Sequence, residues 1–215
     1  MRWQEGVRAV KGWLVFGLVL GLVAVTFMHE SNLIGKITGQ PLPAEKDPLR
    51  RVRAWKETAA CVEEARQKLL QEGKPTFIIS DHYGMAGLFS FYLPAARASL
   101  RPQPLVYYQT SPKADNQLWF WPEYRYGSQR TGQNAIYVSE LDPYPLETGW
   151  LWKWLARKEV RYANVPPPTP APSSLVEEFE SVSDLGVKEI KLGHRVFRRV
   201  QLWECRNLKA IPKTP

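Results

Sequence analysis

A single uncharged apolar run, Gly12–Met28, constrains this chain more than any other feature of its sequence. The run reads GWLVFGLVLGLVAVTFM and continues past a short polar break into Leu33–Ile34. It is long enough to cross a bilayer, which takes about 17–25 residues. The remainder is too polar and too often interrupted by proline to cross again. We therefore expect one membrane anchor over residues 1–34, with its helix at about 12–28.

The charges that flank the run predict its orientation. Arg2, Arg8 and Lys11 precede it, and the first lysine after it is Lys36. The positive-inside rule then places the N-terminus in the cytoplasm and the chain from about residue 30 outside the inner membrane. A cleaved signal peptide is the alternative, and a buried core helix is another. The length of the run and the absence of an A-x-A-like site at Thr26–His29 favour a retained anchor.

The part of the chain after the run, about 185 residues, suits one domain. We expect a connector over residues 35–48 and an extracytoplasmic domain over residues 49–215. The net charge of +8 favours contact with anionic lipid headgroups, although scattered lysine and arginine can also simply solvate a surface. No arginine-aromatic motif of a nucleic-acid module is present, so we expect no nucleic-acid partner.

The first half of this domain predicts a helix, a strand and a second helix. We expect a helix from Pro48 to about Glu72, because apolar residues recur there at spacings of three and four. These residues are Val52, Trp55, Ala59, Val62, Ala65 and Leu69. The short apolar run Thr76–Ser80 is typical of a buried strand. Asp81 is then a natural N-cap for a helix from His82 to about Leu93.

Four further strands complete the expected fold. Residues 104–109 and 135–139 are typical of buried strands, and the first of them closes a βαβ unit with a parallel pair. Residues 176–190 and 194–205 predict an antiparallel hairpin that turns at Gly193. The fold class is therefore α/β: one N-terminal membrane helix, then a small mixed sheet of about five strands.

Two cysteines, Cys61 and Cys205, lie far apart in the sequence. An oxidising compartment permits a disulfide between them, and two buried free thiols are the alternative. The sequence has no C-x-x-C motif and no Cys/His set with metal spacing. We expect neither a metal nor a cofactor.

The segment Ser80–Gly84 (SDHYG) carries the densest set of reactive side chains. It follows the first strand, and ligands of open α/β sheets gather at the carboxyl ends of strands. Adjacent Ser80, Asp81 and His82 cannot form a triad by adjacency alone, because a triad is defined by geometry. An autonomous enzyme would need a distant acid or nucleophile to meet Asp81 and His82. The sequence also lacks G-x-S-x-G, a Walker loop, G-x-G-x-x-G and H-E-x-x-H.

Two aromatic segments are candidate contact surfaces. Residues 115–122 (DNQLWFWP) place three polar residues before Trp119, Phe120 and Trp121. Such a segment can stack on a sugar, lie at a membrane interface or cover the protein core. Residues 150–154 (WLWKW) are amphipathic and suit an interfacial contact with lipid.

The order of these segments resembles a known family. PTFIISDHYGMAGLFSFYLP, PLVYYQ, ADNQLWFWPEY and GQNAIYVSE follow the apolar run in turn. The arrangement resembles the C-terminal extracytoplasmic domain of bacterial polytopic glycosyltransferases that use lipid-phosphate sugars. These are similar to dolichyl-phosphate-mannose–protein mannosyltransferases and to the aminoarabinose transferase of lipid A. The matching positions, within Gly12–Glu140, are Asp81, Tyr83, Phe91, Tyr92, Leu93, Pro94, Asn116, Gln117 and Trp121.

The resemblance implies a binding role without catalysis by this chain. The family's catalytic acid lies in a first extracytoplasmic loop among other membrane helices, and no residue here matches it. The chain would be a detached piece or a free-standing relative of the terminal domain. We expect it to bind a glycan acceptor or lipid-linked sugar, or to assemble with a polytopic membrane protein and membrane lipid. The binding residues would be Asn116, Gln117, Trp119 and Trp121, supported by Asp81 and Tyr83. An autonomous enzyme and a purely structural membrane-assembly subunit are the competing classes.

Overall fold

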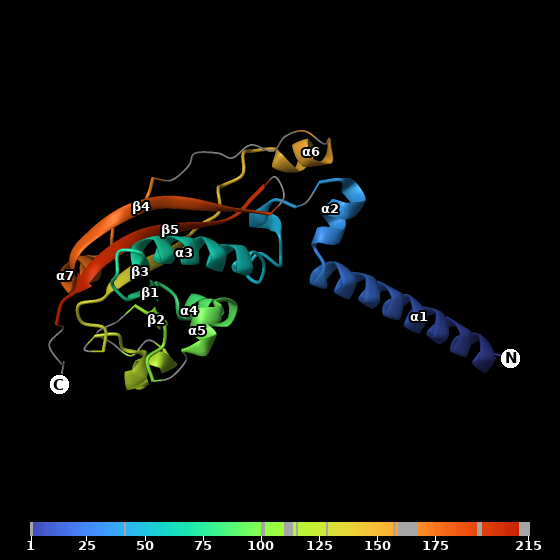
Figure 1. Cartoon of the computed structure of the whole chain (residues 1–215). Helices are drawn as coiled ribbons and strands as arrows, with labels where there is room; N and C mark the ends of the chain where they lie inside the picture. The colour runs from blue at the N-terminus through green and yellow to red at the C-terminus, as the bar shows by residue number, and fades with distance from the viewer. Residues whose placement is uncertain are drawn as a thin grey trace. The chain divides into compact units, whose positions relative to one another are not determined.

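The computed structural model describes residues 2–40, 42–99, 102–109, 114, 116–127, 129–156, 158, 167–192 and 195–210. The chain divides into two compact units (Figure 1). Unit 1 comprises Met1–Arg53 with Pro145–Ala163, and unit 2 comprises Ala54–Tyr144 with Asn164–Pro215.

Unit 1 is built on the long helix α1, Arg2–His29. Its stretch Arg8–His29, 22 residues, is long and apolar enough to cross a membrane by length and composition. Large apolar side chains along it are exposed, as expected for a helix that has no protein core around it. The predicted helix at 12–28 is confirmed within this longer one. Unit 1 also contains α2 (Asn32–Thr38), η1 (Ala44–Lys46) and α6 (Trp150–Leu155).

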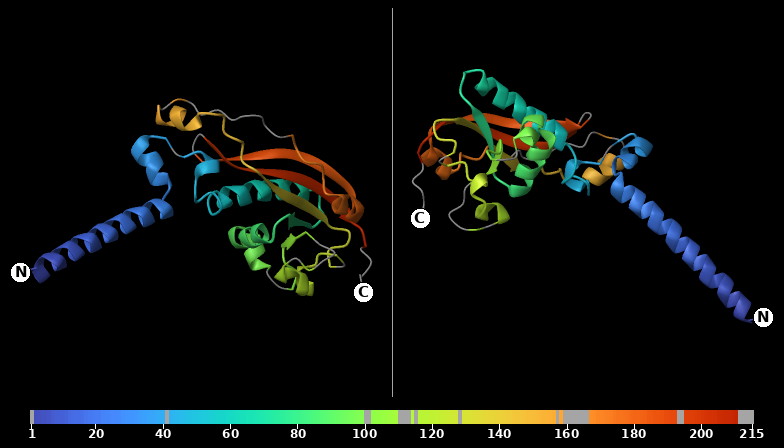
Figure 2. Two further views of the ribbon diagram at one scale, coloured as in Figure 1. Left: turned by 180° about the vertical axis from the view of Figure 1, so that it is seen from behind. Right: turned by 60° about the horizontal axis from the view of Figure 1, so that its bottom comes forward.

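Unit 2 contains a five-stranded sheet in the order β2-β1-β3-β5-β4. The strands are β1 (Thr76–Ser80), β2 (Val106–Tyr108), β3 (Asn134–Leu141), β4 (Phe179–Leu192) and β5 (Arg195–Leu208). β1 pairs in parallel with β2 and β3, whereas β5 pairs antiparallel with β3 and β4. Figure 2 shows the long, curved β4–β5 hairpin beside the shorter strands. The predicted α/β class, the parallel βαβ pair and the antiparallel hairpin are confirmed, while Gly193 lies outside the described residues.

Helices cover the sheet of unit 2 and create two hydrophobic cores. α3 (Trp55–Leu70), α4 (Tyr83–Tyr92) and α5 (Pro94–Ala98) enclose one core with Ile78, Ile136 and Leu202. α7 (Ser173–Glu178) contributes to the second core, around Phe77 and Trp203. Because successive residues of a strand point to opposite faces, Phe77 and Ile78 enter different cores. This explains why every residue of β1 is buried.

The helix predicted from Pro48 is wrong at its start. α3 begins at Trp55, because Leu49 N donates to Asp47 Oδ1 at 2.8 Å and starts a run of turns. Ala54, at φ 63°, then redirects the chain into the helix. Val52 consequently stands 65% exposed, away from the buried stripe. The rest of that stripe forms the buried face of α3, through Trp55, Ala59, Val62 and Leu69.

The two cysteines are free thiols on opposite faces of the sheet. Cys61 borders the core beneath α3, and Cys205 lies within the second core. The free-thiol alternative therefore holds, with Cys61 half-buried and Cys205 fully buried. Burial raises the pKa of both thiols, to about 12 for Cys205, so both stay protonated at neutral pH.

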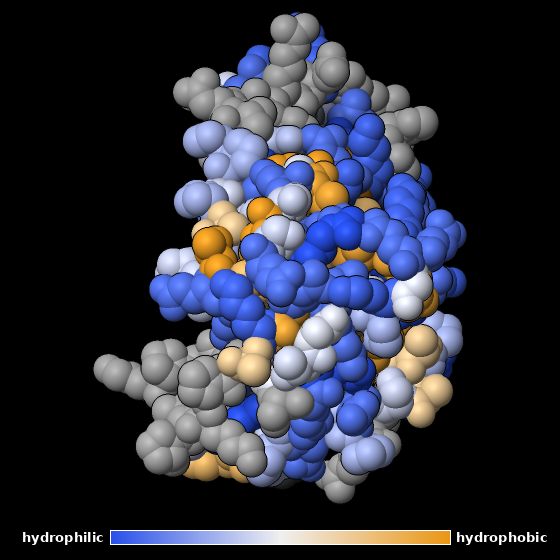
Figure 3. Space-filling view, turned by 60° about the vertical axis from the view of Figure 1, so that its left-hand side comes forward, coloured by the Kyte–Doolittle hydropathy of each residue, from blue (hydrophilic) through white to orange (hydrophobic). Residues whose placement is uncertain are grey.

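Outside α1, apolar surface is sparse on the face of the molecule drawn in Figure 3. The coloured residues of that face are mainly hydrophilic, and the apolar ones form small separate areas. An extended apolar surface is instead found along α1, where Trp13, Leu18 and Leu22 are each at least 66% exposed. This contrast is typical of a polar domain attached to a membrane helix.

Candidate functional site

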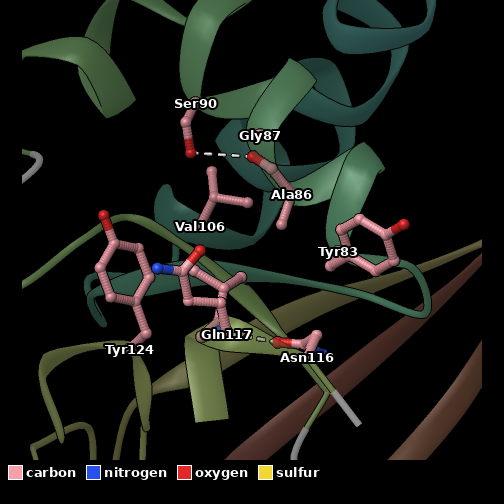
Figure 4. Close-up of a pocket in the computed structure, with 9 residues that line it drawn as sticks. Tyr83, Ala86, Gly87, Ser90, Val106, Asn116, Gln117 and Tyr124 are labelled. Atoms are coloured by element: carbon pink, nitrogen blue, oxygen red, sulfur yellow. Dashed lines mark hydrogen bonds between the residues drawn. The ribbon is translucent and has the colours of Figure 1, made fainter. Parts of the chain in front are cut away.

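A cavity of about 530 Å³ lies in unit 2 between α4, the edge strand β2 and the segment around η2 (Gln117–Phe120) and η3 (Pro122–Tyr124). Its volume falls within the range of about 300–1,000 Å³ that is usual for small-molecule sites. The cavity and its lining are drawn in Figure 4. The lining residues are Tyr83, Ala86, Gly87, Ser90, Val106, Asn116, Gln117, Leu118 and Tyr124.

α4 begins beside this cavity through a cap that the sequence did not predict. His82, in extended backbone, is the N-cap, and its Nδ1 accepts a hydrogen bond from Gly84 N at 3.1 Å. The prediction of Asp81 as the cap is wrong, because its carboxylate is turned toward β3. A side chain at position 84 would be tight, since a Cβ there would lie 3.1 Å from His82 Nδ1. Glycine at 84 therefore suits this start of α4.

One face of α4 supplies the first wall. Tyr83, Ala86, Gly87 and Ser90 recur at helical spacing and share that face. Gly87 leaves open space, since a Cβ built there would meet nothing within 4 Å. Ser90 Oγ donates to the carbonyl oxygen of Ala86 at 2.8 Å, which leaves its lone pairs as acceptors. The cavity thus exists because small residues stand at the centre of this helix face.

The opposite wall comes from η2 and η3. Asn116 caps η2, with its Oδ1 accepting from Leu118 N at 2.9 Å, and Gln117 follows it into the cavity lining. Tyr124 adds an aromatic ring from η3. Figure 4 shows Tyr83 on one side of the cavity and Gln117 with Tyr124 on the other. Two tyrosine rings and the side chains of Asn116 and Gln117 therefore line one space.

Arg130 fixes the position of the edge strand β2, which forms one side of the cavity. Its Nε donates to Tyr107 Oη at 3.0 Å, and its Nη2 donates to the carbonyl oxygens of Gln103 and Pro104 at 3.1 and 2.8 Å. These bonds bind the loop before β2 to the loop before β3. They therefore also fix the start of β2, where Val106 lines the cavity.

Two of the predicted binding residues, Trp119 and Trp121, do not line this cavity. The guanidinium of Arg125 lies 4.6 Å from the centre of the Trp119 ring and also donates to the carbonyl oxygen of Trp119, at 2.7 Å from Nη2. Trp121 packs against Tyr124, with 5.7 Å between ring centres. Both tryptophans therefore support the η2–η3 wall from outside the cavity. The structure brings together Tyr83, Asn116 and Gln117 of the six predicted residues.

Asp81 also lies outside the lining, at the carboxyl end of β1. Its Oδ2 accepts from Ser139 Oγ at 2.5 Å and from Glu140 N at 3.2 Å, which ties the ends of β1 and β3 together. Its Oδ1 is buried and has no hydrogen-bond partner among the described residues. Burial accordingly raises the pKa of Asp81, and the hydrogen bonds from Ser139 and Glu140 oppose this only in part.

The reactive residues of Ser80–Gly84 turn to different partners. Ser80 Oγ donates to the carbonyl oxygen of His82 at 3.0 Å. The His82 ring stacks on Tyr83 with 4.4 Å between ring centres, while its Nδ1 serves the helix cap. Asp81 points to Ser139. This geometry gives an autonomous enzyme built on Asp81 and His82 no support.

The lining of the cavity is uncharged. Among the described residues that form it there is no aspartate, glutamate, lysine, arginine or histidine. Nor do the described parts of the chain bring three or more His, Cys, Asp or Glu side chains into a group that could hold a metal ion. The described lining can therefore stack rings and exchange neutral hydrogen bonds, and it supplies neither a carboxylate nor an imidazole for proton transfer.

Sequence reasoning missed Gly87, Ser90 and Tyr124. A signal for the first two existed, because small residues at 86, 87 and 90 interrupt the apolar pattern of Tyr83–Tyr92 on one face. Tyr124 gives no comparable signal, since its approach to α4 depends on the path of the loop after β2.

The chain was compared with protein-family models, with curated proteins and with solved structures. None of the three comparisons returns a match.

Proposed function

We propose that this protein is a membrane-anchored module that binds a neutral glycan in the cavity between α4 and η2. The observation that carries the proposal is the composition of that cavity, in which tyrosine rings and amide groups line a space and the described lining residues carry no charge. A sugar offers hydroxyl groups that both donate and accept, and an apolar ring face. Amides match the first property and aromatic rings match the second.

The setting of the module follows from its anchor and its resemblance to a family. α1 would hold the module in the inner membrane with unit 2 outside the cytoplasm, as the positive charges before the helix favour. The likeness of its segments to the terminal domain of lipid-phosphate-sugar glycosyltransferases favours a glycan acceptor or a lipid-linked sugar. Because the described lining of the cavity contains no carboxylate or imidazole, the transfer itself would belong to a polytopic membrane partner.

A titration of the full chain with small glycosides tests the cavity. Methyl α-mannoside, methyl β-galactoside and their disaccharides serve as neutral probes, with methyl glucuronide as an anionic one, monitored by saturation-transfer NMR in detergent. We expect binding of at least one neutral probe. We expect the glucuronide to bind more weakly, because burial of its carboxylate is not compensated by a cation in the lining.

Replacing Gln117 by Ala tests whether the η2 side of the cavity contacts the glycoside. Loss of one hydrogen bond, about 0.5–1.5 kcal/mol, corresponds to a roughly twofold to twelvefold weaker Kd. Gln71→Ala, an exposed amide after α3, is the matched control and should leave the Kd unchanged. Equal affinities of both variants and the wild type would contradict the assignment of η2 as a binding wall.

A further inference from the structure

The short helix α6 of unit 1 exposes large apolar side chains on one side. Leu151, Trp152 and Leu155 are 45%, 74% and 55% exposed, and their spacing of one and four residues places them on one side of the helix. Single exposed apolar side chains are common on protein surfaces, whereas three neighbouring ones on a helix of six residues indicate a contact surface. We call these three residues the α6 face.

Another side of α6 packs within unit 1. Trp150 and Trp154 are half-buried. Lys46 Nζ of η1 lies 5.8 Å from the centre of the Trp150 ring. Just before α6, Leu146 N donates to Glu45 Oε2 of η1 at 3.2 Å. These two contacts join the α6 segment to η1 and leave the α6 face on the exposed side of the helix.

η1 is in turn joined to the end of α1. Asp47 directly follows η1, and its Oδ1 accepts from Ser31 Oγ, two residues after α1, at 2.7 Å. Arg53 Nη1 donates to the other carboxylate oxygen of Asp47 at 2.8 Å. Ser31 and Asp47 are both buried, so water competes little for these bonds. A chain of contacts within unit 1 therefore runs from the end of the bilayer-length helix to α6.

The charges beside the α6 face are paired with one another. Lys153 Nζ of α6 lies 2.9 Å from Glu147 Oε1, and Lys46 Nζ lies 3.0 Å from Glu45 Oε1. The α6 face therefore offers apolar and aromatic contact and requires no charged ligand. Tryptophan and leucine on one side of a helix favour the boundary between lipid headgroups and acyl chains.

We propose that the α6 face inserts into the surface of the bilayer that α1 crosses, and that zwitterionic phospholipid is sufficient for this contact. The inference rests on the proposed function only through the membrane anchoring of α1 and does not depend on glycan binding. A membrane-spanning α1 places His29 at the bilayer surface. Because contacts join α6 to this end of α1, the lipid surface is the partner that continuity with the anchor selects. A second contact with the bilayer would restrict rotation of unit 1 about the axis of α1.

Depth-dependent fluorescence quenching of the full chain in phosphatidylcholine vesicles tests this contact. An NBD label is attached to Leu155→Cys in a chain whose half-buried Cys61 is replaced by Ser, while the buried Cys205 stays unlabelled. Val176→Cys on α7 carries the label as the control, because Val176 is also 55% exposed and lies in unit 2. Doxyl groups placed near the headgroups should quench the label at position 155 at least threefold more than the label at position 176. Equal quenching of the two labels would overturn the contact.

Trp152→Glu in the chain labelled at position 155 tests the α6 face itself. A carboxylate on this face opposes insertion, so quenching should fall to the level measured at position 176. Val176→Glu, in the same labelled chain, makes the same change of charge away from α6 and should leave the quenching unchanged. Undiminished quenching in Trp152→Glu would show that the label alone enters the bilayer, and would overturn the proposal.

A label at Leu18→Cys, near the middle of Arg8–His29, separates this inference from membrane anchoring. Doxyl groups near the ends of the acyl chains should quench this label more than doxyl groups near the headgroups do. Quenching at position 18 without quenching at position 155 overturns the α6 contact alone. Absence of quenching at position 18 overturns membrane anchoring together with the contact that rests on it. Quenching at both positions, each at its own depth, supports both.

Discussion

Asp81 is the residue at which burial and charge oppose each other most clearly. Its carboxylate receives hydrogen bonds from Ser139 and Glu140 on one oxygen only, and its other oxygen is buried without a hydrogen-bond partner among the described residues. Burial raises its pKa in the folded protein above the ordinary 3.8. An acid with a raised folded-state pKa stabilises the fold below its unfolded pKa, and that contribution disappears as the pH rises through the folded pKa.

Asp81→Asn should therefore become more stable relative to the wild type as the pH rises from about 3.5 to 7. The asparagine oxygen still accepts from Ser139 and Glu140, and the side chain no longer ionises. Chemical unfolding of the full chain in detergent across this pH range measures the difference. Glu64→Gln is the control: the exposed Glu64 has its pKa lowered by Lys68, so its trend should have the opposite sign. If the difference in unfolding free energy between Asp81→Asn and the wild type did not change with pH, it would contradict a pKa of Asp81 raised by burial.

At the scale of single elements, α4 combines a structural role with the wall of the cavity. Gly87 is destabilising in the interior of a helix by about 0.5–1 kcal/mol relative to alanine. Because a Cβ at this position meets nothing within 4 Å, Gly87→Ala should raise the free energy of unfolding by about that amount.

Gly84→Ala is the matched comparison in the same helix. There a Cβ would lie 3.1 Å from His82 Nδ1, so the cap would have to shift and no such gain is expected. Thermal unfolding of both variants provides the measurement. A stabilised Gly84→Ala together with a destabilised Gly87→Ala would show that the description of this helix is wrong.

The bounds of a helix or strand could be predicted where the local sequence pattern alone determines them. β1 was predicted with its observed bounds, since the run Thr76–Ser80 is buried on both faces of the sheet. The start of α3 could not be, because a hydrogen bond from Leu49 N to Asp47 and the left-handed Ala54 override the helical periodicity. α2 was also missed, since seven residues containing Gly35 carry little periodic signal.

The candidate site could be predicted only in part, for a related reason. Tyr83, Asn116 and Gln117 were selected as polar or aromatic residues in dense segments, and they do share the cavity. Trp119 and Trp121 were selected on the same grounds, but contacts with Arg125 and Tyr124 hold them outside it. Which ring faces a cavity depends on the path of the loop, and a local pattern does not encode that path.

At the scale of the whole molecule, the chain joins a membrane-compatible unit to a unit with a cavity whose described lining is uncharged. The anchor alone would suit many functions, and the cavity alone would suit many neutral ligands. Their combination in one chain is what favours recognition of a glycan at a membrane surface. We therefore propose that the cavity beside α4, within the full chain, is the place of binding.

The most direct measurement fills that cavity and records glycan binding. Gly87→Phe projects a ring into the open space, whereas Ala60→Phe places the same ring on an exposed position of α3. Titrated in lipid nanodiscs with the best neutral glycoside, the full chain carrying Gly87→Phe should bind at least tenfold more weakly than the wild type. Ala60→Phe should bind as the wild type does. Undiminished binding by Gly87→Phe would contradict the account.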